Sequence, residues 1–275
     1  MQVGTMEILP VLDATYAAPP SRAYEGADIK EAWEPHRYLL NENGELEGSM
    51  GGFLVRGGGG GHVTLVDLGL GENTMMGFRG GAMLDSLAKY GLTPGDITDV
   101  VMTHLHLDHI GWASQGGARV FPNATYRCDR ADWEHFVVDP SGGGTRTVHP
   151  LIALGRDLLE PTTERLETWS TDGPILPGLD AMRIPGHTPG STIMVVSDGT
   201  ARAMLLGDVV HCAVELLDDE WDGFADVDPV QAKKARNALV RELEGTDVPV
   251  AAAHFPGLQF GRIIFGESPR RFHFM

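Results

Sequence analysis

The sequence predicts an α/β protein that forms a single domain over residues 1–275. Short apolar runs rich in β-branched residues alternate along the chain with segments that have the apolar spacing of helices. No internal repeat and no long linker divides the chain, and 275 residues are enough for one large domain. Several apolar runs end directly at a histidine or an aspartate, so reactive side chains are expected where strands end.

The N-terminal 50 residues are polar and irregular apart from the apolar stretch Ile8–Leu12. They predict a strand at a sheet edge followed by a surface loop. Phe53–Arg56 and Val63–Asp67 flank five glycines, which is typical of a hairpin with a flexible tip. The other predicted elements are helix 82–90, a helix start at Thr93-Pro94, strand 99–103, strand 120–127, helix 129–138, loop 141–144, helix 151–159, strands beginning at 181, 192 and 203, a helix capped by Asp228-Pro229, and strand 248–253.

The composition excludes several kinds of partner. A net charge of −17 disfavours binding to nucleic acid or to an anionic membrane, because both need a basic surface. No apolar run approaches the roughly 20 residues of a membrane span, and the N-terminus lacks a secretory signal pattern. Cys128 and Cys212 match no disulfide framework and no thiolate zinc spacing. We therefore expect a cytoplasmic protein, for which a homodimer is compatible with the sequence.

The strongest chemical signal is the run His104-Leu-His106-Leu-Asp108-His109, which follows the predicted strand 99–103. On one helix, these four ligand-type side chains would point in several directions. On a tight loop after a strand, His104 and His106 can reach one metal ion while Asp108 and His109 reach a second. Imidazole suits zinc, and a mixed imidazole and carboxylate set suits zinc, iron, manganese or cobalt.

Three further ligand-type residues follow apolar runs. His187 lies in the turn Gly186–Gly190, where glycine and proline fix a sharp change of direction. Asp208 follows the apolar run 205–206, and a carboxylate buried there needs a partner charge or a metal ion. His254 follows the predicted strand 248–253.

These motifs resemble the metallo-β-lactamase superfamily, in the order that the family has them, from about Leu54 to Gly266. The motifs are Thr103–His109, Gly186–Gly190, Gly207-Asp208 and Ala253-His254, with Val66-Asp67-Leu-Gly69 similar to the family's Asp-Thr-Gly segment except for Leu68. The resemblance implies an αββα four-layer sandwich with a dinuclear metal site at one edge of the two sheets. It implies that His104, His106 and His187 hold one ion, that Asp108, His109 and His254 hold the other, and that Asp208 bridges both.

The resemblance is strongest to the lactonase-like and organophosphate-hydrolase-like branch. β-Lactamases of the family carry cysteine in place of Asp208, and flavodiiron proteins carry glutamate in place of His106. Nucleases of the family have basic surfaces, and glyoxalase II has a longer basic C-terminal extension. The ending Ala253–Gly257 followed by Phe260-Gly-Arg262 is similar to the lactonase-like group.

The predicted activity is hydrolysis of an ester or lactone of a small molecule by a hydroxide that bridges two divalent metal ions, zinc first among the candidates. Asp108 could orient that hydroxide or pass a proton to the leaving group. His211 stands where acyl-homoserine lactonases have a tyrosine, and it could donate to an oxyanion, shuttle protons, or have a structural role only. Phosphotriesterase or phosphodiesterase activity, and a non-catalytic metal-dependent binding protein, are the alternatives.

The substrate pocket is predicted from aromatic and apolar residues near the ligand loops. They are Met75, Met76, Phe78, Trp112, Trp221 and Phe255. The loop 74–80 could cover the site, and Arg79 within it could meet an anionic substrate.

Overall fold

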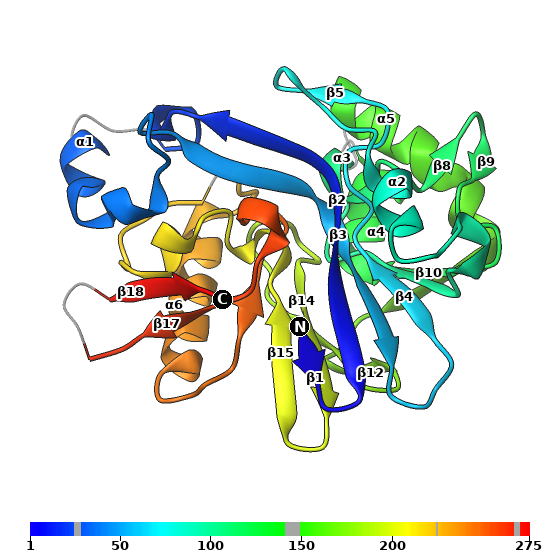
Figure 1. The fold of residues 1–275 in the computed structure, drawn as a ribbon. Helices are drawn as coiled ribbons and strands as arrows, with labels where there is room; N and C mark the ends of the chain where they lie inside the picture. The colour runs from blue at the N-terminus through cyan, green and yellow to red at the C-terminus, as the bar shows by residue number, and fades with distance from the viewer. Residues whose placement is uncertain (25–28, 141–148, 224, 267–269) are drawn as a thin grey trace.

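The computed structural model of the protein contains two seven-stranded sheets that pack against each other and carry helices on their outer sides (Figure 1). It describes residues 1–24, 29–140, 149–223, 225–266 and 270–275, so the predicted loop 141–144 lies outside the described residues. In Figure 1, α2, α4 and α5 lie on one side of the sheets and α6 lies on the other. The predicted αββα layering is therefore confirmed. Among the described residues, no helix has the length and apolar character needed to cross a membrane.

The first sheet is built from the N-terminal half of the chain. Its strands, in spatial order, are β1 (Gln2–Val3), β2 (Met6–Ala18), β3 (Leu46–Gly57), β4 (Val63–Val66), β7 (Asp99–Val101), β10 (Thr125–Asp129) and β11 (Leu166–Trp169). The β3–β4 hairpin is the predicted one. The prediction that residues 1–50 are irregular outside Ile8–Leu12 is wrong, because β2 extends over 13 residues. β2 is extended because it pairs with β3 from Met6 to Ala18, and this pairing is not visible in the local sequence.

The second sheet is built from the C-terminal part. Its strands, in spatial order, are β12 (Gly173–Leu176), β13 (Leu179–Arg183), β14 (Thr192–Asp198), β15 (Ala201–Leu205), β16 (Val250–Ala251), β17 (Gly261–Ile264) and β18 (Arg271–Phe274). β16 is much shorter than the predicted strand 248–253, and the β17–β18 pair was not predicted. Two small hairpins, β5–β6 (Thr74–Met75, Phe78–Arg79) and β8–β9 (Ser114–Gln115, Ala118–Arg119), lie outside the two main sheets.

The helices confirm most of the predicted ones. They are α1 (Ile29–Ala32), α2 (Met83–Ala88), α3 (Leu107–Ile110), α4 (Arg130–Trp133), α5 (Pro150–Leu159) and α6 (Pro229–Leu243), with a π-helical turn at Glu134–Val138 and short 3₁₀ turns at Pro20–Arg22, Glu34–Leu39, Pro94–Asp96, Glu160–Arg165, Gly207–Val209, Ala213–Leu216 and Pro256–Leu258. Asp228 caps α6 by accepting a hydrogen bond from the Gln231 backbone N–H, as its position before Pro229 predicts. Thr93-Pro94 begins only a three-residue turn, and the predicted strand 120–127 begins at Thr125.

Alternation of side chains along the strands produces the layers. Val100 of β7 packs with Met83 and Leu87 of α2 on the outer face of the first sheet, while its neighbour Val101 packs between the two sheets. In β14, Met194 and Val196 pack between the sheets, whereas Ile193 and Val195 pack towards Leu239 and Leu243 of α6. A period of two residues therefore fills three apolar interfaces from two sheets that are buried on both faces.

Candidate metal centre

The seven predicted ligands all follow strands of the two sheets. His104 and His106 come after β7, and Asp108 and His109 lie on the short helix α3 that follows them. His187 is in the turn after β13, Asp208 follows β15, and His254 follows β16. Gly207 makes the approach of Asp208 feasible, because its φ is +54° and a Cβ atom there would lie 2.7 Å from Thr103 Oγ1. Strand ends thus bring residues from distant parts of the sequence to one place.

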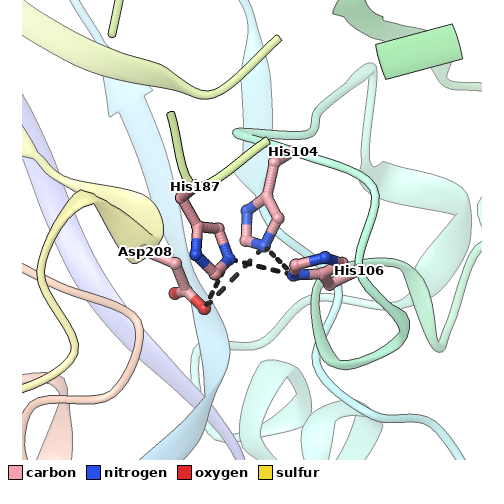
Figure 2. A group of neighbouring side chains, drawn as sticks. All are labelled: His104, His106, His187 and Asp208. Atoms are coloured by element: carbon pink, nitrogen blue, oxygen red, sulfur yellow. Dashed lines mark hydrogen bonds and ion pairs between the residues drawn. The ribbon is translucent and has the colours of Figure 1, made fainter. Parts of the chain in front are cut away.

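Four of these residues form a first group, drawn in Figure 2. His106 Nδ1 lies 3.1 Å from His104 Nε2 and 2.9 Å from His187 Nε2. Asp208 Oδ2 lies 3.8 Å from His104 Nε2 and 3.6 Å from His187 Nε2. Figure 2 shows the three rings and the carboxylate pointing toward one another, with His104 and His106 on one loop and His187 and Asp208 on two others. Three imidazole nitrogens and a carboxylate oxygen converge on one small volume.

The second group consists of Asp108, His109 and His254. His254 Nε2 lies 3.4 Å from Asp108 Oδ2 and 3.2 Å from Asp208 Oδ2. His109 Nε2 lies 3.2 Å from Asp208 Oδ1. Asp208 therefore contacts both groups, with Oδ1 beside His109 and Oδ2 beside His104, His187 and His254.

The donor set fits two divalent cations. His109 Nε2 and Asp208 Oδ1 are buried and form no hydrogen bond, although only 3.2 Å separates them. Burying such atoms without a partner is costly, and a cation between them would remove the cost. Burial and the neighbouring imidazoles lower the pKa values of His104 and His106 well below the ordinary value. The negative charge of Asp208 raises both pKa values, but by less. These rings are therefore neutral, which is the form that binds metal.

The ring nitrogens that face away from the centre are held by other groups. His109 Nδ1 lies 3.0 Å from Asp67 Oδ2, His187 Nδ1 lies 2.9 Å from Asp226 Oδ1, and His254 Nδ1 lies 3.0 Å from the Ser49 carbonyl oxygen. Such contacts fix the tautomer and orientation of a metal-binding imidazole. Asp67 belongs to a motif singled out in the sequence, whereas Asp226 and Ser49 were missed because neither has a local sequence signal.

Asp132 of α4 links two of the ligand loops and was also missed. Its buried carboxylate accepts hydrogen bonds from Leu105 N at 3.2 Å, Thr188 Oγ1 at 2.9 Å and Gly190 N at 2.6 Å. Burial raises the pKa of this carboxyl to about 7, against the three hydrogen bonds, which lower it. The loop that carries His104 and the turn that carries His187 are therefore attached to the same side chain.

His211, the residue at the tyrosine position of the resemblance, lies at the edge of the centre. Its Nε2 atom is 3.4 Å from Asp208 Oδ2, and its ring stacks on that of His254 with centroids 5.7 Å apart. Burial lowers the pKa of His211, but the charge of Asp208 and the contacts with Asp208 and Glu215 raise it to about 10. A protonated imidazole at this place can donate a hydrogen bond toward the centre.

The centre opens into a largely apolar cavity of about 470 Å³. Met75, Met76 and Phe78 line it as predicted, together with residues of α5 and of the N-terminal segment. Three predicted pocket residues are wrong. Trp112 is buried in the core and donates a hydrogen bond to Asp13 Oδ1, Phe255 packs on Phe272, and Trp221 packs on Tyr24 and Trp33.

The cationic residue predicted for the pocket is also wrong. Arg79 is exposed and does not line the cavity, whereas Arg22 and Arg156 do. Arg22 donates a hydrogen bond to the Met76 carbonyl oxygen at 3.0 Å and lies over the Phe78 ring at 5.3 Å. The turn at Pro20–Arg22 is thereby attached to the β5–β6 hairpin on one side of the cavity.

Comparison with known proteins defines the class. The model of the metallo-β-lactamase superfamily matches residues 52–254, so the chain belongs to this superfamily. N-acyl homoserine lactonase AttM of Rhizobium radiobacter is 29% identical over 63% of this chain and 64% of its own length. Metallo-β-lactamase domain-containing protein 1 of Rattus norvegicus is 30% identical over 58% of this chain and 52% of its own length.

Solved structures share the same fold over the whole chain. The hydrolase AbOPH superposes with a TM-score of 0.84 at 23% identity, covering 100% of this chain and 95% of that one. AidC, a dizinc quorum-quenching lactonase in complex with a product, superposes with a TM-score of 0.79 at 22% identity and with the same coverage. The chain therefore has the metallo-β-lactamase fold. Its sequence matches to the two curated relatives span less than two-thirds of the length of each relative.

Proposed function

We propose that the protein is a metal-dependent hydrolase that cleaves an ester or a lactone of a small molecule. The observation that carries the proposal is the convergence of seven ligand-type side chains in two groups that share Asp208. His104, His106, His187 and Asp208 would hold one cation, and Asp108, His109, His254 and Asp208 would hold the other. The imidazole-rich donor set favours zinc, with iron, manganese and cobalt as alternatives.

Two divalent cations held by these residues would supply an activated water near neutral pH and would polarise the carbonyl of the substrate. The protein contributes the remaining steps. Asp108 lies beside the ligands with a carboxylate that can accept a proton from the attacking water and return it to the departing oxygen. His211 Nε2 faces Asp208 at 3.4 Å, so it can donate to the oxygen on which negative charge develops. The water oxygen bonds to the acyl carbon, the bond between that carbon and the ring or ester oxygen breaks, and the departing oxygen takes up the proton that Asp108 accepted.

The cavity supports a small apolar substrate. Its walls include Met75, Met76, Phe78 and Leu151, and its volume of about 470 Å³ is within the range of small-molecule sites. Two relatives described as lactonases favour attack on a carbonyl over attack on a phosphoryl centre.

The test combines metal analysis with a substrate panel. Zinc-loaded protein is assayed with lactones of several ring sizes, aryl esters, and aryl phosphodiesters and phosphotriesters, and its metal content is measured. We expect about two ions per chain and turnover of lactones or esters. His106→Ala should lose one ion and most of the activity, whereas His273→Ala, which removes an exposed histidine, should retain both. Turnover of phosphoesters alone, or full activity of His106→Ala, would overturn the proposal.

A further inference from the structure

A buried glutamate lies behind His211. Glu215 is in the short turn Ala213–Leu216, four residues after His211, and its side chain is fully buried. A buried carboxylate needs partners that compensate for lost hydration. The partners of Glu215 are His211, Tyr24 and Arg236, and their positions indicate the role of its side chain.

Glu215 contacts His211 twice. Its Oε2 atom accepts a hydrogen bond from the His211 backbone N–H at 3.2 Å, and its Oε1 atom lies 3.7 Å from His211 Nδ1. The opposite ring nitrogen, Nε2, lies 3.4 Å from Asp208 Oδ2. The imidazole is therefore placed between a carboxylate behind it and the shared carboxylate of the two ligand groups in front of it.

Two other segments of the chain hold Glu215. The Tyr24 hydroxyl donates a hydrogen bond to Oε1 at 2.5 Å, and Arg236 Nη1 lies 3.7 Å from Oε2. Arg236 is itself only 1% exposed and donates to the carbonyl oxygens of Trp221 and Val209. Tyr24 comes from the N-terminal segment and Arg236 from α6. Two segments that are distant in the sequence therefore fix the position of the Glu215 carboxylate.

We propose that Glu215 is the positioning residue of His211, and that Tyr24 and Arg236 hold Glu215 in the orientation that this requires. A carboxylate behind an imidazole keeps a proton on the nearer nitrogen and fixes the ring plane, so the far nitrogen always faces the reaction. Arg236 compensates the negative charge of the carboxylate, and Tyr24 donates a hydrogen bond to Oε1. This inference rests on the proposed hydrolase function and on the role of His211 in it.

The test is a double-mutant cycle with Glu215→Gln and His211→Asn in the zinc-loaded enzyme. It uses an aliphatic lactone and an aryl ester that the wild type turns over. Glu215→Gln should lower kcat about 10- to 100-fold, with KM changed less than about twofold. In the His211→Asn background the same substitution should cost less than about twofold, because Glu215 acts through the ring that is missing.

Matched controls separate positioning from general damage. Asp99→Asn removes a different buried carboxylate, which pairs with Arg127 at the start of β7 and away from the site, and it should lower stability but leave kcat unchanged. Glu215→Asp keeps the charge and should recover part of the lost kcat. Metal content and melting temperature are measured for every variant.

A second readout does not depend on activity. In ¹⁵N-labelled, zinc-loaded wild type, the proton on His211 Nδ1 should give a signal protected from exchange with solvent, and Glu215→Gln should broaden or remove it. An unchanged Nδ1 proton signal in Glu215→Gln, or equal losses of kcat with and without His211, would overturn the inference. A wild type that turns over no ester or lactone, but loses the Nδ1 proton signal in Glu215→Gln, would refute the proposed function and leave the positioning role intact.

Discussion

Replacing Asp67 with asparagine should weaken the second ligand group without moving the backbone. Asp67 Oδ1 accepts a hydrogen bond from Thr103 N at 2.8 Å, while Oδ2 accepts one from Thr103 Oγ1 at 2.8 Å and lies 3.0 Å from His109 Nδ1. Its φ is +62°, a region that asparagine tolerates as well as aspartate does. The change is therefore confined to one atom of the side chain.

The magnitude follows from the position of the new amide group. In one orientation the –NH₂ faces the Thr103 backbone N–H, and a buried donor left without an acceptor costs about 1–3 kcal/mol. In the other orientation it faces His109 Nδ1, which forces the proton onto Nε2, the nitrogen beside Asp208. Loss of a contact of this kind lowers metal affinity about 10- to 100-fold. This corresponds to about 1.4–2.8 kcal/mol of binding free energy.

The assay is a zinc competition titration with a chromophoric chelator, run beside thermal unfolding. The Asp67→Asn protein should keep one tight ion and bind the other about 10- to 100-fold more weakly. Asp99→Asn is the matched control, since Asp99 is also a buried carboxylate but lies at the opposite end of β7 from His104, and it should lose stability but keep both zinc affinities. Two unchanged zinc affinities in Asp67→Asn would refute the assignment of His109 to the site.

Three further predictions concern the cavity, acid stability and the cations. Gly48→Ala should raise KM severalfold, because a Cβ atom there would lie 2.3 Å from the ring of Tyr16, which lines the cavity. Gly95→Ala, whose Cβ would meet nothing closer than 3.7 Å, should leave KM unchanged in the same kinetic assay. Burial raises the pKa of Asp99, but hydrogen bonds and the charge of Arg127 outweigh it and hold that pKa below the ordinary value. The ionised Asp99 therefore stabilises the fold at pH values above its ordinary pKa, and this contribution is lost as the pH falls. Between neutral pH and about pH 3, the melting temperature of Asp99→Asn should fall by less than that of the wild type. Removing metal with a chelator should lower the melting temperature and abolish turnover, and both should return on adding zinc; a melting temperature unaffected by the chelator would argue against two bound cations.

The sequence was sufficient to predict which ligand-type residues meet. Four of them each follow an apolar strand: His104, His187, Asp208 and His254. The ends of these strands lie at a common edge, whatever the length of the segments that connect them. The layered fold and the division of these residues into two ligand sets were predicted from the resemblance that the motifs carry. The structure brings the same residues together in two groups.

The residues around that set could not be predicted in the same way. Whether Trp112 faces the cavity or the core depends on Asp13, 99 residues earlier, which accepts its N–H. Glu215 resembles any other glutamate until Tyr24 and Arg236 are seen to enclose it. The extent of β2 depends on pairing with β3 across 12 register positions, which no local propensity reveals. Each of these facts depends on contacts between segments that are distant in the sequence.

The division of the ligand set between the two sheets has a mechanical consequence. Four of the seven ligand-type residues follow a strand of the first sheet, and three follow strands of the second: His104, His106, Asp108 and His109 after β7, and His187, Asp208 and His254 after β13, β15 and β16. A cation bound here would tether one sheet to the other across the open end of the sandwich, as a disulfide joins distant parts of a chain. Loss of the cations would then free the two halves to shear along their shared apolar interface. Amide hydrogen exchange should accordingly accelerate on both sides of the sandwich at once.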